Sequence, residues 1–225
     1  MNYVIIPAFN EERKLRLVVE GCLEYTPNVI VVDDGSTDNT LGTILAIKPK
    51  HKDLVIISNK VNKGKGAALR DGCDYAFNHG AENIIVLDGD GQHRPRRIVE
   101  ILSYLKEKDL VFTYRTFNKN MPLIFRIGNW FINTTACILF NIKVSDVLCG
   151  YKGFKAKSYP QIRWESVGYS IEVDISSRIK GLSMVELPIE TIYHDRYKGT
   201  NVFDGIHIIL YSLKIYVKRL LRWTQ

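Results

Sequence analysis

Two aspartates that follow a short apolar run are the residues of this sequence best suited to chemistry. Asp88 and Asp90 are separated by one glycine and come directly after the run at 84–87. Two carboxylates this close repel each other unless a cation lies near both, and oxygen ligands of this kind favour Mg²⁺ or Mn²⁺. Gln92 and His93 follow closely enough to complete a metal shell. A solvated turn whose aspartates cap a helix explains the tripeptide equally well.

A second acidic turn follows the apolar run at 29–32. Asp33 and Asp34 come directly after this run, and Gly35 after them allows a sharp turn. The Asp34 carboxylate could accept hydrogen bonds from the N–H groups of a nucleotide base. Alternatively, the two aspartates only stabilise the turn and the N-terminus of the helix that follows.

Two basic segments could contact the phosphates of such a nucleotide. In the segment 62–69, glycines alternate with lysines at the start of a helical pattern. This segment lacks the dinucleotide fingerprint, because Leu69 stands in place of the third glycine, and it is not a Walker loop. In the segment 193–200, Arg196 and Lys198 could clamp a diphosphate. A solvated basic loop is the alternative for this second segment.

Alternating strands and helices must position these loops. We expect strands at 3–7, 29–32, 54–57, 84–87 and 110–113, and helices at 11–25, 38–47, 65–78 and 95–106. Continuous apolar runs indicate a sheet covered on both faces, and the alternation with helices indicates mostly parallel strands. Ligands of such sheets bind at the carboxyl ends of the strands. The acidic loops should therefore meet at one edge of the sheet.

The second half of the chain is less regular and contains two amphipathic helices. We expect a helix at 125–140, a loop at 145–152, a helix at 171–180, a strand at 184–188 and a helix at 203–223. The helix at 125–140 carries Trp130, Phe131 and Phe140. The last helix has an apolar stripe and four basic residues, namely Phe203, Ile206, Leu210, Leu213, Val217 and Leu220 with Lys214, Lys218, Arg219 and Arg222. Basic amphipathic helices can lie in a membrane interface, and packing against the core is the equally weighted alternative.

The composition sets the class of protein. The 225 residues, with no linker-like stretch, suit one α/β domain at 1–225. The net charge of +7 favours anionic partners. We expect no membrane span and no signal peptide, because no apolar run is long enough and a strand begins almost at once. Cys22, Cys73, Cys137 and Cys149 have no Cys-x-x-Cys spacing, which indicates a reducing, cytoplasmic compartment.

The ordered set of segments resembles the family 2 inverting glycosyltransferases, which have the GT-A fold. The resemblance runs through 5–12, 32–38, 62–66, 87–93 and 146–154 to Arg196. It is closest to the polyprenyl-phosphate (dolichyl-phosphate) mannosyl- and glucosyltransferases. It implies a single Rossmann-like domain with a nucleotide-sugar-binding half at 1–115. The acceptor-binding half, at 116–225, would then contain the amphipathic helices.

The resemblance also implies roles for individual residues. It assigns the nucleotide base and ribose to Pro7, Phe9, Glu11, Val32 and Asp34. It makes Asp88 and Asp90 the metal and diphosphate motif, with Gln92 as a further metal ligand, Arg115 as a donor-side arginine and Arg196 as the diphosphate-binding arginine. Lys65, Gly89 and Lys198 complete the expected donor-binding set. Thr200-Asn201 stands where the family often has a Ser-Lys pair, so Lys198 is the candidate for the missing charge.

The implied reaction is metal-dependent transfer of mannose or glucose, from GDP-mannose or UDP-glucose, to a polyprenyl phosphate. The enzyme would be cytoplasmic, at the cytoplasmic face of a membrane. A lipid phosphate is already anionic at neutral pH, whereas a sugar hydroxyl would need a general base. Glu172 and Asp174 are the candidates for that base, and surface positions on an ordinary helix are the alternative.

Other functions predict different sequence features or products. A family 2 enzyme with a saccharide or protein acceptor would use the same donor, and only an assay with a panel of acceptors would distinguish it. A nucleotidyltransferase would release pyrophosphate, and the glycine-rich N-terminal loop usual for that class is missing here. A catalytically silent nucleotide-binding module would tolerate loss of Asp90. Nucleic acid is disfavoured, because no recognition motif accompanies the basic charge and the acidic loops would repel a phosphate backbone.

Overall fold

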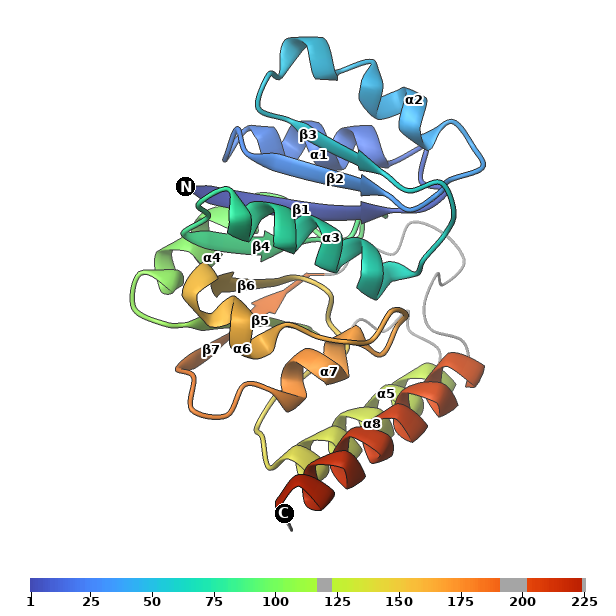
Figure 1. Ribbon diagram of the computed structural model, residues 1–225, viewed down its shortest axis with the longest axis vertical. Coiled ribbons are helices and arrows are strands. Elements are labelled where there is room, and N and C mark those ends of the chain that lie inside the picture. Colours follow the sequence, from blue (N-terminus) through green and yellow to red (C-terminus); the bar gives the residue numbers. More distant parts are fainter. Residues whose placement is uncertain (117–122, 191–201, 224–225) are drawn as a thin grey trace.

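The computed structural model describes residues 1–116, 123–190 and 202–223. At its centre lies a seven-stranded sheet in the order β3-β2-β1-β4-β6-β5-β7 (Figure 1). The strands are β1 (Asn2–Ala8), β2 (Val29–Asp33), β3 (Val55–Ser58), β4 (Asn83–Val86), β5 (Leu110–Arg115), β6 (Lys152–Lys155) and β7 (Met184–Ile189). Strand β6 is antiparallel to β4 and β5, and the other pairs are parallel.

Helices cover both faces of the sheet. They are α1 (Leu15–Leu23), α2 (Thr40–Leu45), α3 (Lys65–Asn78), α4 (Arg97–Leu105), α5 (Leu123–Phe140), α6 (Tyr159–Ile162), α7 (Ile171–Ser177) and α8 (Val202–Trp223), with 3₁₀ turns at Lys48–Lys50 and Ala156–Ser158. Ile6 of β1 packs with α1, α2 and α4, whereas Ile5 packs with α3, α5 and α7 on the opposite face. Successive side chains of a strand point to opposite faces, so continuous apolar strands serve two cores.

The expected α/β architecture, with a mostly parallel sheet flanked by helices, is confirmed. The expected strands occur with ends shifted by a residue or two, and α3 has the expected bounds. Helix α1 begins at Leu15 instead of residue 11, and α7 ends at Ser177 instead of residue 180. The prediction of a loop up to residue 152 was wrong at its end, because Lys152 begins β6. Strand β6 escaped prediction since its four residues begin and end with lysine.

The two amphipathic helices pack side by side at one end of the molecule (Figure 1). Ile208 of α8 and Ile132 of α5 are buried in the core. The six residues of the expected apolar stripe of α8 are instead exposed, from 43% at Leu213 to 83% at Phe203. The alternative that this stripe packs against the core is therefore wrong. On α5, Trp130 and Phe131 are also exposed, while Phe140 is buried.

None of the helices in the described ranges is long and apolar enough to cross a bilayer. The four cysteines are free thiols.

Helix α3 lies directly on the sheet at Gly72, which yields a stability prediction. A Cβ at this position would lie 2.4 Å from Cγ2 of Ile5 and 3.0 Å from Cγ2 of Val32. We expect Gly72→Ala to lower the free energy of unfolding by about 1–2 kcal/mol, because overpacking outweighs the gain in helix propensity. Gly128→Ala on α5, where a Cβ would meet nothing within 4 Å, is the matched control. Urea denaturation should show this control unchanged or stabilised; equal effects of both substitutions would contradict the packing argument.

Candidate functional site

The loops at the carboxyl ends of β1, β2 and β4 line a pocket of about 560 Å³. Most residues expected at a donor and metal site lie in its wall. These are Pro7, Phe9, Glu11, Asp34, Lys65, Asp88, Gly89, Asp90, Gln92, Arg115 and Glu172. The topology explains this convergence, because parallel strands end at the same edge and release their polar loops there.

A half-buried lysine bridges two carboxylates inside the pocket. Nζ of Lys65, at the start of α3, lies 2.8 Å from Oδ1 of Asp88 and 2.9 Å from Oε1 of Glu172 in α7. Burial disfavours the charge on Lys65, but the two carboxylates outweigh it and raise the pKa of the lysine. The ammonium in turn keeps the pKa of Asp88 below its ordinary value despite burial. Glu172 is only 5% exposed, so the alternative of a surface position is wrong for this residue.

Asp90 has a different electrostatic environment from Asp88. Burial, reinforced by the negative charge of Asp88, raises the pKa of Asp90 to about 6. Its Oδ1 accepts a hydrogen bond of 2.9 Å from the backbone N–H of Gln92. Two carboxylates close together in a buried site therefore disfavour full ionisation of the pair without further positive charge.

This donor set fits a hard divalent cation. In the part of the chain that the structure describes, no three His, Cys, Asp or Glu side chains form a metal-binding group. The pocket offers the carboxylates of Asp88 and Asp90 and the side-chain amide of Gln92. Mg²⁺ commonly uses one or two carboxylates and takes its remaining ligands from substrate phosphates and water. The residues present suit a cation that arrives with a phosphorylated ligand.

Asp34 holds the loop that leads into α3. Its Oδ1 accepts hydrogen bonds from Lys63 N (3.0 Å) and Asn59 Nδ2 (3.0 Å), and its Oδ2 accepts one from Gly64 N (2.7 Å). Gly64 has φ of +95°, a left-handed conformation that favours glycine. Asp34 thus has a structural role in a turn, and it also faces the pocket.

Arg115 lies at the end of β5 and is held by a bidentate ion pair. Its Nε lies 2.7 Å from Oδ2 of Asp146, and its Nη2 lies 2.9 Å from Oδ1 of the same residue. This geometry fixes the guanidinium plane at the pocket wall. Sequence reasoning included Asp146 in a family-like segment but gave it no role, because no local pattern pairs it with Arg115.

Two of the expected site residues that the structure describes, Val32 and Asp174, do not line the pocket. Val32 is fully buried in the core beneath α3. Asp174 is also fully buried, so a surface position is excluded, but its Oδ1 pairs with Arg178 Nε at 2.7 Å outside the pocket lining. Asp174 is therefore not placed for the direct contact with a ligand in this pocket that a catalytic base would need. Arg196 and Lys198 lie outside the described residues.

Sequence reasoning missed several residues of the second half that also line the pocket. They include Asn129, Leu148, Gly150, Gly168 and Tyr169. Of these residues, Gly150 was the most predictable from the sequence, since it lies inside the family-like segment 146–154. A Cβ at Gly150 would lie 2.4 Å from Oδ2 of Asp88 and 3.0 Å from Nζ of Lys65, so any other residue here would displace the side chains of the bridge.

Known proteins with similar sequences and folds share this architecture. Residues 3–163 match the model of Glycosyl transferase family 2. A UDP-N-acetylglucosamine–dolichyl-phosphate N-acetylglucosaminyltransferase of Methanococcus voltae is 30% identical, over 97% of each chain. The polyprenol monophosphomannose synthase of Mycolicibacterium smegmatis is 28% identical, over 91% of this chain and 82% of the relative.

Among solved structures, glucosyl-3-phosphoglycerate synthase from Mycobacterium tuberculosis superposes with a TM-score of 0.76 at 17% identity, covering 95% of this chain and 79% of that one. A complex of the same enzyme with Mn²⁺, UDP-glucose and phosphoglyceric acid gives a TM-score of 0.72. The chain belongs to glycosyltransferase family 2, and its fold is the GT-A fold. Its relatives include enzymes that transfer sugars to polyprenyl phosphates.

His93 gives the site a measurable dependence on pH. Burial lowers the pKa of His93 to about 4, from the ordinary 6.5, and its buried Nδ1 has no hydrogen-bond partner among the described residues. Because the unfolded chain binds the proton first, stability contributed by neutral His93 is lost as pH falls from 6.5 towards 4. Between pH 7 and pH 5, the free energy of unfolding of the wild type should fall by about 2 kcal/mol more than that of His93→Gln. Parallel pH profiles of the two proteins in urea denaturation would contradict this assignment.

Proposed function

We propose that this chain transfers a hexose from a nucleotide-diphosphate sugar to a polyprenyl phosphate, with inversion and with the help of Mg²⁺ or Mn²⁺. Family membership supports the transfer of a glycosyl group. The near full-length similarity to two enzymes named for lipid-phosphate acceptors supports the acceptor class. GDP-mannose and UDP-glucose are the leading donors. The division into a donor half at 1–115 and an acceptor half at 116–225 is part of the proposal.

One observation favours a phosphate over a hydroxyl as the acceptor group. The two carboxylates considered as the general base for a hydroxyl are already paired with cations: Glu172 with Lys65, and Asp174, outside the pocket lining, with Arg178. A phosphate oxygen is already ionised at neutral pH and needs no such base.

On the donor side, the chain's own residues bind the nucleotide sugar and receive its leaving group. Pro7, Phe9 and Glu11 are proposed to contact the nucleoside. A cation held by Asp88, Asp90 and Gln92 would supply positive charge against the diphosphate. Arg115 orients the donor, and Arg196 with Lys198 remains proposed for the diphosphate.

The transfer itself is a single displacement. An oxygen of the acceptor phosphate forms a bond to the anomeric carbon, while the bond from that carbon to the diphosphate oxygen breaks. The departing nucleoside diphosphate keeps the electron pair, and no proton has to move. Attack from the face opposite the leaving group inverts the anomeric configuration. The protein contributes orientation and positive charge where negative charge develops.

The exposed apolar stripes support work at a membrane surface on the cytoplasmic side. The stripe of α8 is accompanied by Lys214 and Lys218, both exposed. Contiguous apolar surface of this kind marks an interaction site, and basic residues beside it favour anionic lipid. Asn129 of α5 lines the pocket, and α5 packs against α8, the helix that carries the stripe. A lipid-bound acceptor could therefore reach the pocket from the bilayer.

A donor and acceptor panel tests the proposed reaction. The protein is incubated with GDP-mannose, UDP-glucose or UDP-N-acetylglucosamine and a short polyprenyl phosphate, with Mn²⁺, with Mg²⁺ or with chelator. We expect one donor to yield glycolipid only when divalent metal is present. Transfer to a saccharide acceptor alone would replace the lipid-phosphate proposal by the second candidate, and pyrophosphate release from a nucleoside triphosphate would indicate a nucleotidyltransferase.

The two aspartates at the end of β4 should be indispensable for turnover. We expect Asp88→Asn and Asp90→Asn each to lower kcat/KM by on the order of 1,000-fold, because each removes negative charge from the cation site. Asp53→Asn, at an exposed surface position, is the control and should retain wild-type activity. Near-normal rates in either pocket variant would remove the role assigned to that aspartate.

The apolar stripe of α8 should be required for vesicle binding. Leu210 is 60% exposed on α8, and Leu17 is 72% exposed on α1, away from the stripe. We expect Leu210→Asp to weaken co-sedimentation with vesicles that contain anionic phospholipid by roughly 10-fold, through lost apolar burial and added negative charge. Leu17→Asp should have no such effect. Equal binding by both variants would speak against α8 as the membrane-facing element.

A further inference from the structure

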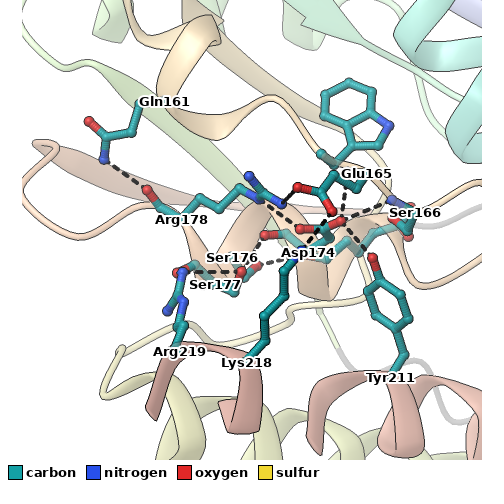
Figure 2. A network of polar contacts seen from close by, with 12 residues as sticks. Gln161, Glu165, Ser166, Asp174, Ser176, Ser177, Arg178, Tyr211, Lys218 and Arg219 are labelled. Atoms are coloured by element: carbon teal, nitrogen blue, oxygen red, sulfur yellow. Dashed lines mark hydrogen bonds and ion pairs between the residues drawn. The ribbon is translucent and has the colours of Figure 1, made fainter. Parts of the chain in front are cut away.

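Asp174 lies at the centre of a buried polar network between the pocket and α8. Its Oδ1 accepts a hydrogen bond of 2.7 Å from Arg178 Nε. Its Oδ2 accepts three more: from Glu165 N (2.9 Å), Ser166 N (3.0 Å) and the Tyr211 hydroxyl (3.0 Å). Figure 2 shows these groups converging on the carboxylate from the loop before α7, from Arg178 just after α7 and from α8.

The loop held by Asp174, residues 164–168, is packed tightly against the start of α3. The indole N–H of Trp164 donates to Gly66 O at 2.7 Å, and Ala67 N donates to Val167 O at 3.2 Å. A Cβ at Gly64 would lie 2.4 Å from Val167 O, and one at Gly66 would lie 2.5 Å from Ser166 O. The position of this loop therefore determines where the backbone around Lys65 can lie.

Both sides of this contact reach the pocket. Gly64 and Lys65 line it at the start of α3, and the neighbouring Gly168 lines it at the end of the loop. Two backbone N–H groups of the loop depend on one carboxylate oxygen, and a charged acceptor makes such bonds stronger than neutral ones. Loss of that acceptor would leave two donors to find other partners, and the loop would shift relative to α3.

We propose that Asp174 is a positioning residue, not the general base of the reaction, and that with Tyr211 it fixes the 164–168 loop so that the pocket binds the nucleotide. This inference rests on the proposed function, because it concerns the nucleotide site of the same pocket. It differs from a base role in its consequences: a base acts on the acceptor during transfer, whereas a positioning residue affects donor binding before any acceptor is present.

Three substitutions separate these roles. Asp174→Asn keeps the size of the side chain and removes the charge. Tyr211→Phe removes only the hydroxyl group that donates to Asp174. Ser212→Ala, at the next position of α8, removes a buried hydroxyl group that donates to Ile208 O within the same helix, and it serves as the matched control.

The experiment measures the Kd of the full chain for UDP and for GDP by calorimetry, with Mn²⁺ and without acceptor. We expect the Kd of the bound nucleotide to rise about 50-fold in Asp174→Asn and about fivefold in Tyr211→Phe, with Ser212→Ala unchanged. Hydrogen exchange at the amides of Glu165, Ser166 and Ala67 should accelerate in the first two variants only. In turnover assays the donor KM should rise more than kcat falls.

Other results would overturn the inference. Unchanged nucleotide affinity in both variants, or a large loss of kcat at unchanged Kd in Asp174→Asn, would return Asp174 to a role in the chemical step. An equal loss of affinity in Ser212→Ala would indicate general disturbance of α8. If Asp174→Asn does not fold, Tyr211→Phe decides alone. Failure of the wild type to bind either nucleotide would instead refute the proposed function.

Discussion

The contact of Lys65 with Asp88 and Glu172 is the interaction on which the pocket depends. It joins the start of α3, the loop after β4 and α7, three segments that are far apart in the sequence. The buried Glu172 and the half-buried Asp88 would destabilise one another without this ammonium. The bridge therefore permits acidic residues to gather at the edge of the sheet, and it sets the distance between the two sides of the pocket.

Other carboxylates in and near the pocket are also stabilised by ion pairs or hydrogen bonds. Asp146 pairs with Arg115 and Asp174 with Arg178, whereas Asp34 accepts hydrogen bonds from backbone N–H groups of the loop before α3. Asp90 differs, since its raised pKa reflects burial and a negative neighbour. The pocket wall nevertheless contains more carboxylates than cations, and Asp88 and Asp90 place part of this negative charge where a divalent cation would bind.

The sequence predicted the elements with strong periodicity and the loops between them. Strand β2 and helix α3 are clear because a continuous apolar run and a regular helical pattern are local properties. Strand β6 is not, since Lys152 is buried by long-range packing that no four-residue pattern reveals. The edge of the sheet could be predicted from topology, whereas the partners of Asp88, Arg115 and Asp174 could not. Those contacts depend on how the second half folds over the first. For α8, periodicity predicted the helix, but only the tertiary structure shows that its apolar stripe faces outward.

Helix α8 has two faces with different surroundings. Its exposed stripe faces the surroundings, while Tyr211 contacts Asp174, Lys218 pairs with Glu165 at 3.3 Å, and Arg219 donates to Ser177 (Figure 2). An α-helix is stiff along its axis, so a tilt or a shift imposed on its outer side moves its inner side as well. The curvature or lateral pressure of a surface in contact with α8 would thus alter the position of Tyr211, and with it the 164–168 loop beside the pocket.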